Sequence, residues 1–252
     1  MRVMAHLVAG YTSASIAEAA AEGLASGGIA YFEIQFPFSD PSADGKAIQS
    51  ACSQVLSGGW TLSEGFSFVR TLSRRYPSIP VYIMSYANLA YKTGIPRFVE
   101  TCAEAGCKGF IIPDLPFDSD EGLALMCTKT GLLSIPVVAP SMRPARIAQL
   151  SALNPPLVYA ALRAGITGSQ TIIDEQTLSF LRSVDAAPGT PSRILAGFGI
   201  RTGEQARQLA GQVHAVVAGS VFVDLIRENA DLGTDRVQNA VALKARELSG
   251  FA

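Results

Sequence analysis

Short apolar runs alternate with amphipathic stretches from one end of the chain to the other. The apolar runs are rich in β-branched and aromatic residues, and this composition is typical of buried strands. They predict eight strands, at residues 4–9, 31–35, 81–85, 109–112, 134–138, 157–161, 193–196 and 215–218.

The stretches between these runs are amphipathic and have the length of globular helices. Several of them begin at a Ser, Thr or Asp, which cap helix N-termini, and end near a Gly or Pro. They predict helices at residues 13–26, 62–75, 95–105, 119–130, 143–152, 174–184, 203–210 and 235–248.

Eight strand–helix units within 252 residues have the count and the length of a (β/α)8 TIM barrel. We expect one domain over residues 1–252, because no low-complexity linker divides the chain. A doubly wound open sheet is the alternative. It is less consistent with the pattern, since no GxGxxG follows the first strand and open sheets rarely need eight such even units.

Composition and charge narrow the class of partner. The formal net charge is −1, from 20 Lys plus Arg against 21 Asp plus Glu, and there is no basic run to bind nucleic acid or an anionic membrane. No stretch approaches the roughly 18 apolar residues of a membrane span. The N-terminal apolar run is too short for a signal sequence, so we expect a soluble, cytoplasmic protein.

The cysteines and histidines give no sign of a metal site. Four cysteines without CxxC spacing and two histidines make a zinc site improbable, and a disulfide framework is unnecessary in a chain of this size. We expect reduced thiols and no metal.

The second predicted strand, YFEIQ, has an acidic residue at its centre. Alternate strand residues share a face, so Phe32 and Ile34 point one way and Glu33 points the other. The aromatic face suits contact with helices, which directs Glu33 into the barrel. An acid in such a dry interior is suited to give and take a proton near neutrality. The alternative is a structural Glu paired with an inward Lys or Arg.

The loop after this strand has a second carboxylate, Asp44, and we expect the loop to run to about Gly59. Long loops after barrel strands are usually functional, and Pro37 and Pro41 indicate a defined shape. Two carboxylates in different surroundings can divide the chemistry, one moving protons and one staying ionised. Asp44 precedes a glycine, so it is alternatively a plain turn residue.

Glycines follow the last two predicted strands. Gly199 follows the seventh, and Gly219 and Ser220 follow the eighth and open a short helical stretch at residues 221–228. Barrels often bind phosphate at this place, because backbone N–H groups and a helix N-terminus approach the anion. A further loop at residues 163–168 begins with Arg163 and predicts either a closing lid or a surface loop.

Five motifs occur in order along nearly the whole chain. They are FPFSDPSADG at residues 36–45 with Ile48 and Gln49, YAN at 86–88, PDLP at 113–116, GITG at 165–168 and GFGI at 197–200. This set closely resembles the tryptophan synthase alpha chain family, and FPFSDPxADG is highly specific to it. The resemblance implies a TIM barrel that takes part in L-tryptophan biosynthesis. Its reaction would be the retro-aldol cleavage of indole-3-glycerol phosphate to indole and glyceraldehyde 3-phosphate, without a metal or organic cofactor in this chain.

The resemblance also implies roles for single residues. Glu33 looks like the acid–base group that protonates the indole ring at C3 and relays the hydroxyl proton. Asp44 looks like the carboxylate that stabilises the resulting cation through the ring N–H. Tyr159 is similar to a tyrosine lining the site, and Phe198 to the aromatic neighbour of the indole. The positions that match phosphate-binding residues are Gly168, Gly199, Gly219 and Ser220, while Arg163 and Thr167 would belong to the lid.

The resemblance further implies a partner. In this family the barrel mouth contacts a beta chain that carries pyridoxal phosphate and receives indole, in a heterotetramer of two alpha and two beta chains. Asp40, Pro41 and Asn88 match positions near that interface.

The sequence departs from the family pattern at three places. Gln35 stands where a glycine is usual, His6 stands where an apolar or aromatic residue is usual, and the helix before strand one is missing, which makes the N-terminus short. His6 and Gln35 could crowd or rewet the indole pocket. Two alternatives therefore stay open: a catalytically weak chain that mainly activates a beta chain, or a different phosphate-binding barrel.

Overall fold

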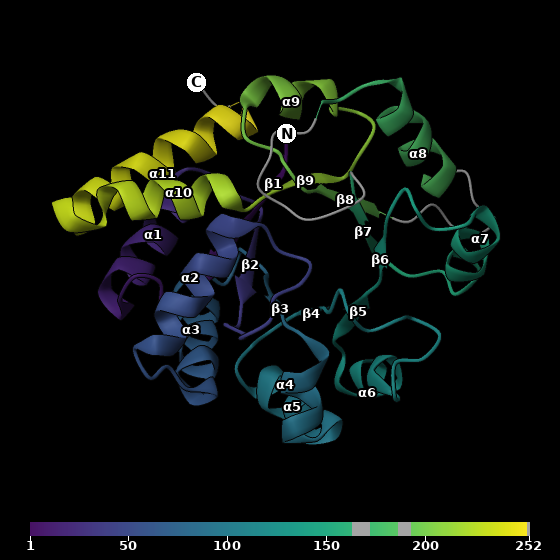
Figure 1. Cartoon of the computed structure of the whole chain (residues 1–252), viewed down its shortest axis with the longest axis horizontal. Coiled ribbons are helices and arrows are strands. Elements are labelled where there is room, and N and C mark those ends of the chain that lie inside the picture. The colour runs from purple at the N-terminus through teal and green to yellow at the C-terminus, as the bar shows by residue number, and fades with distance from the viewer. Residues whose placement is uncertain (163–171, 186–192, 251–252) are drawn as a thin grey trace.

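The computed structural model describes residues 1–162, 172–185 and 193–250. Its strands are all parallel and form one sheet in the order β5-β4-β3-β2-β1-β9-β8-β7-β6, curved into a barrel (Figure 1). This confirms the predicted TIM-barrel class. The strands are β1 (Val3–Val8), β2 (Tyr31–Gln35), β3 (Val81–Met84), β4 (Gly109–Ile111), β5 (Leu133–Ile135), β6 (Val137–Val138), β7 (Leu157–Ala161), β8 (Arg193–Gly197) and β9 (Ala215–Ala218).

The two ends of the sheet meet at a proline. Pro136 separates β5, which pairs with β4, from β6, which pairs with β7. Proline has no backbone N–H, so it interrupts the ladder, although its carbonyl still accepts a hydrogen bond from Tyr159 N at 2.9 Å. The predicted strand at residues 134–138 is therefore two short strands that together fill one of the eight barrel positions.

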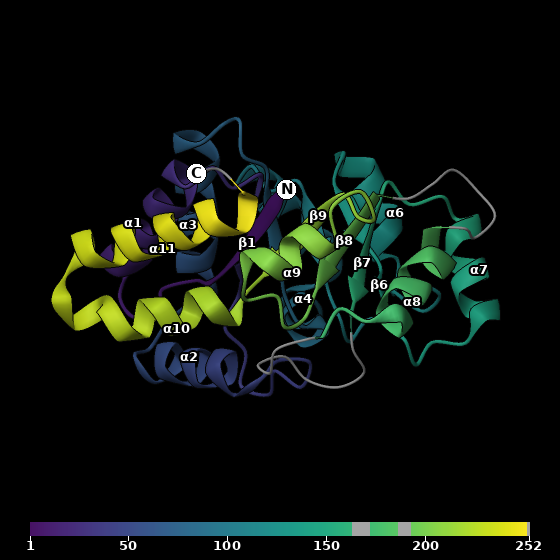
Figure 2. The same ribbon diagram turned by 90° about the horizontal axis from the view of Figure 1, so that it is seen from above.

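Helices surround the barrel (Figures 1 and 2). They are α1 (Ala14–Ser26), α2 (Lys46–Ser57), α3 (Leu62–Arg75), α4 (Ala87–Thr93), α5 (Ile95–Glu104), α6 (Leu123–Thr130), α7 (Pro144–Ala152), α8 (Glu175–Asp185), α9 (Gly203–Gln208), α10 (Ser220–Asn229), the 3₁₀ turn η1 (Ala230–Leu232) and α11 (Thr234–Ser249). Capping boxes fix the start of two of them, Thr61 with Glu64 at α3 and Thr202 with Gln205 at α9. None of the described helices is long and apolar enough to cross a membrane.

The prediction of a loop as far as Gly59 was wrong. Helix α2 occupies most of it, and the loop after β2 ends at Gly45. The buried face of α2 consists of Ile48, Ala51, Cys52 and Val55, whose spacing of three, four and seven residues is helical. The short α4 was also not predicted.

Two buried clusters lie on the two faces of the sheet. The outer cluster holds Phe32, Ile34 and Phe36 and packs against the helices. The inner cluster holds Met4, Tyr82, Met84, Ile111, Leu195 and Val217. Because Phe32 and Ile34 face outward, the side chain of Glu33 between them points into the barrel.

Candidate active site

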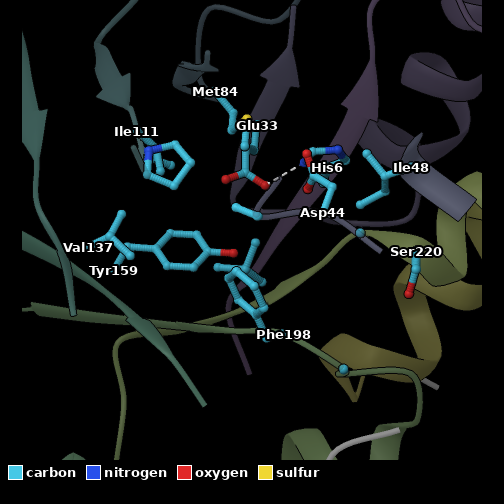
Figure 3. Close-up of a pocket in the computed structure, with 15 residues that line it drawn as sticks. His6, Glu33, Asp44, Ile48, Met84, Ile111, Val137, Tyr159, Phe198 and Ser220 are labelled. Atoms are coloured by element: carbon cyan, nitrogen blue, oxygen red, sulfur yellow. Dashed lines mark hydrogen bonds and ion pairs between the residues drawn. The ribbon is translucent and has the colours of Figure 1, made fainter. Parts of the chain in front are cut away.

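One cavity lies at the C-terminal end of the barrel (Figure 3). Its walls come from strands β1, β2, β3, β4, β6, β7 and β9, from the loops after β2, β4, β8 and β9, and from the first turns of α2 and α10. Polar groups of this cavity come from segments far apart in the sequence, and apolar side chains separate them. Its labelled lining residues are His6, Glu33, Asp44, Ile48, Met84, Ile111, Val137, Tyr159, Phe198 and Ser220.

The carboxylate of Glu33 is paired with an imidazole. Strands β1 and β2 place His6 directly opposite Glu33 in register, and Nδ1 of His6 lies 2.7 Å from Oε2 of Glu33 (Figure 3). Both residues are buried, with exposed fractions of 3% and 2%. Burial lowers the pKa of His6, but the hydrogen bond and charge of Glu33, together with the charge of Asp44, raise it above its usual value overall.

Asp44 is the second buried carboxylate of the cavity. Its Oδ2 accepts hydrogen bonds from Nε2 of Gln35 and from the hydroxyl of Tyr86, each at 2.8 Å. Burial raises the pKa of Asp44, while the charge of His6 and the two hydrogen bonds oppose that rise.

Two aromatic side chains form the wall opposite these carboxylates (Figure 3). Tyr159 in the middle of β7 and Phe198 after β8 meet edge to face, with ring centroids 6.1 Å apart. Phe198 has φ 78°, a left-handed conformation that is unusual for a residue with a side chain. This turn directs its ring into the cavity. Burial, with the negative charges of Glu33 and Asp44, raises the pKa of Tyr159 well above its usual value, so its hydroxyl stays protonated.

The other end of the cavity is suited to an anion. Gly199, Gly219 and Ser220 line it, and Ser220 begins α10, whose N-terminal backbone N–H groups favour negative charge. Arg201 Nη1 donates a hydrogen bond to Ser220 Oγ at 3.1 Å, and Arg201 Nη2 contacts Asp224 at 2.9 Å. Since Ser220 accepts from Arg201, its own hydroxyl hydrogen remains available to an anion.

Several predicted site residues are not in the cavity. Asp40 is exposed in the loop that follows β2, Asn88 is exposed in α4, and Pro41 is buried. Arg163, Thr167 and Gly168 lie outside the described residues. Within the described ranges, no group of three or more His, Cys, Asp or Glu side chains is placed to hold a metal ion.

Sequence reasoning did not find the partners of the two carboxylates or of Ser220. Tyr86 belongs to the YAN motif and Arg201 directly follows GFGI, yet neither was assigned a role. His6 and Gln35 were identified only as departures, and the structure shows that each contacts a carboxylate. The paired register of β1 and β2 is the signal that connects His6 to Glu33.

The fold is that of a TIM-barrel enzyme, and its cavity has buried carboxylates at one end and backbone amides suited to an anion at the other. Comparison with protein families narrows the assignment of this chain. The family model described as "Tryptophan synthase alpha chain" matches residues 2–250. The chain belongs to the tryptophan synthase alpha chain family.

Individual relatives agree with this family. The tryptophan synthase alpha chain of Helicobacter hepaticus is 38% identical over 233 residues, covering 90% of this chain and 86% of the relative. That of Methanosarcina acetivorans is 36% identical over 248 residues, covering 98% and 86%. Among solved structures, a tryptophan synthase structure from Mycobacterium tuberculosis has a TM-score of 0.85 at 28% identity, covering 97% of this chain and 92% of the other.

Proposed function

We propose that this chain cleaves indole-3-glycerol phosphate to indole and glyceraldehyde 3-phosphate, the carbon–carbon lyase reaction of its family, with Glu33 as the acid–base group. The observation that carries the proposal is that Glu33, Asp44 and the Gly219–Ser220 turn line one cavity. A single small molecule can therefore contact an acid at one end and backbone amides at the other.

The chemistry follows from the two carboxylates. A proton from Glu33 adds to C3 of the indole ring and makes the ring an electron sink. Asp44 accepts a hydrogen bond from the ring N–H and stabilises the positive charge. The glycerol hydroxyl next to the ring then gives its proton to Glu33, the carbon–carbon bond breaks, and its electron pair returns to the ring. Side chains of this chain supply every group that these steps use.

The surrounding groups orient the substrate. We place the indole against the rings of Tyr159 and Phe198, where an aromatic ring can pack. The phosphate lies on Gly199, Gly219 and Ser220, with Arg201 holding the Ser220 hydroxyl in position. The acids at one end and the backbone amides at the other fix the orientation of the bound substrate.

The same family membership supports a beta-chain partner. The exposed Asp40, in the loop after β2, and Asn88, in α4, lie at the barrel mouth, where product leaves. We propose that this mouth binds a beta chain carrying pyridoxal phosphate, in a complex of two alpha and two beta chains, in the cytoplasm. Gln35 and His6, which could have blocked the pocket, are instead hydrogen-bonded to Asp44 and Glu33.

Indole release from indole-3-glycerol phosphate tests the proposal. The wild-type chain, alone and with a cognate beta chain, is compared with Glu33→Gln and with the control Glu18→Gln, an exposed acid on α1. We expect cleavage by the wild type and the control, and loss of at least about a hundredfold in Glu33→Gln with the fold intact. Unchanged turnover in Glu33→Gln would reject the role of Glu33. A chain that stimulates the beta chain but releases no indole would reject the lyase activity.

A further inference from the structure

His6 and Gln35 lie between the two carboxylates of the site. His6 contacts Oε2 of Glu33 through Nδ1 at 2.7 Å, and Gln35 donates from Nε2 to Oδ2 of Asp44 at 2.8 Å. All four side chains are buried. Each of the two carboxylates is therefore bonded to a polar side chain that projects into the barrel from β1 or β2.

The remaining polar atoms of these two side chains are complementary. Within the described part of the chain, Nε2 of His6 and Oε1 of Gln35 are buried and have no hydrogen-bond partner. An unpaired buried polar atom costs about 1–3 kcal/mol, so this arrangement needs a reason. A protonated ring offers an N–H at Nε2, and Oε1 is an acceptor. Gln35 also contributes to the raised pKa of His6.

We propose that His6 shares a proton with Glu33, and that the hydrogen bonds from His6 and Gln35 hold Glu33 and Asp44 in place. His6 is then a positioning residue that acts through Glu33, and the proton used by the reaction is held on the Glu33–His6 pair. This inference rests on the proposed function for its catalytic part only.

Over one catalytic cycle, the Glu33–His6 pair gives up one proton and regains one. The proton on Nδ1 of His6 passes to Oε2 of Glu33, and Glu33 passes it to C3 of the indole. The pair is now one proton short, with Glu33 as carboxylate and His6 neutral. The substrate hydroxyl then gives its proton to Glu33 as the carbon–carbon bond breaks, and transfer back to Nδ1 restores the starting state.

The charges around His6 favour the protonated ring. Glu33 faces it from β2 and Asp44 from the loop before α2, and both attract positive charge. On the side of α10 the ring is next to Gly219, where an added Cβ would lie 3.4 Å from Cβ and Cγ of His6. Cys52 of α2, which contacts Gln35, is neutral because burial raises its pKa to about 12. The imidazolium thus lies between two acids and faces no charged base among the described residues.

The titration of His6 tests the pairing directly. The chain has two histidines, so ¹⁵N-histidine NMR spectra with a His214→Gln variant assign both rings. We expect His6 to stay doubly protonated above its ordinary pKa of 6.5. Its midpoint falls in Glu33→Gln, and falls less in Gln35→Ala, while His214 keeps its own midpoint in both. A His6 midpoint at or below 6.5 in the wild type, or one that Glu33→Gln leaves unchanged, would overturn the pairing.

Kinetics of two His6 variants test the catalytic role. His6→Asn keeps a neutral donor near the Nδ1 position, and His6→Phe removes it. We expect kcat to fall at least about tenfold in both while KM changes little, because the proton is lost and the phosphate contacts remain. The basic limb of the wild-type pH profile should coincide with the His6 midpoint and be displaced in His6→Asn.

The outcomes separate the two proposals. If the wild type cleaves the substrate and His6→Asn keeps its kcat and its pH profile, the role of His6 is wrong and the lyase activity stands. If the wild type releases no indole, the proposed function fails, and the NMR titration still decides whether His6 and Glu33 share a proton.

Discussion

The hydroxyl of Tyr86 provides the sharpest test of how Asp44 stays ionised. It donates a 2.8 Å hydrogen bond to Oδ2 of Asp44, whose pKa burial raises. The ring of Tyr86 also stacks on Phe38, with centroids 5.2 Å apart, so Tyr86→Phe removes the donor and keeps the packing. A hydrogen bond to a charged group contributes about 1.5–3 kcal/mol, and one pKa unit corresponds to about 1.4 kcal/mol.

The direction of the expected pH shift depends on which protonation form of Asp44 the reaction uses. The reaction needs the carboxylate, and a raised pKa means that this form is lost at a higher pH than for an ordinary Asp. Removing a donor to the carboxylate raises the pKa of Asp44 further. We therefore expect the acid limb of kcat/KM for indole release to move up by about one to two pH units in Tyr86→Phe, with little change on the plateau.

A second buried tyrosine serves as the control. Tyr82 lies in the inner cluster, and its ring packs against Tyr31 rather than on Phe38. Tyr82→Phe removes a hydroxyl of the same kind and should leave the acid limb in place. Equal shifts in the two variants, or an unmoved limb in Tyr86→Phe with native stability, would refute the view that Tyr86 holds Asp44 in its ionised form.

Three other results are expected. In Gly197→Ala, the new Cβ would lie 2.3 Å from the hydroxyl oxygen of Tyr159. We therefore expect the free energy of unfolding, measured in denaturant melts, to fall by about 1–3 kcal/mol and kcat to fall as well. Wild-type values for both quantities would contradict this prediction. In Gly219→Ala, the added methyl group would lie 3.4 Å from His6 and narrow the anion end of the cavity. We expect KM to rise while the melting temperature stays that of the wild type. An unchanged KM would contradict binding of the phosphate at this end of the cavity. The four buried cysteines should not react with a thiol reagent at neutral pH before the chain unfolds. The reason is that burial raises the pKa of Cys52, Cys107 and Cys127 to about 12. Rapid labelling of the folded chain would disprove this.

Much of the barrel could be predicted because its strands are short, apolar and evenly spaced. The predicted bounds of β2, β7 and β9 agree with the structure, and alternation along β2 was enough to direct Glu33 inward. The glycines after β8 and β9 could be placed at the same end of the barrel, because parallel strands share one direction.

The rest depended on information that a local pattern does not contain. Helix α2 was hidden by the prolines and glycines before it, although its apolar spacing is helical. The contact of His6 with Glu33 depends on strand register, and that of Tyr86 with Asp44 depends on how two loops fold over the barrel mouth. Such contacts between distant segments need the assembled fold.

The central claim is that one substrate molecule reaches both the buried acids and the anion end of the cavity. A crystal structure of Glu33→Gln with intact indole-3-glycerol phosphate tests it most directly, since this variant should bind the substrate without cleaving it. We expect the ring nitrogen within hydrogen-bond distance of Asp44 and the phosphate on the backbone amides of Gly219 and Ser220. A phosphate bound away from that turn, or an indole ring outside the barrel, would contradict the account.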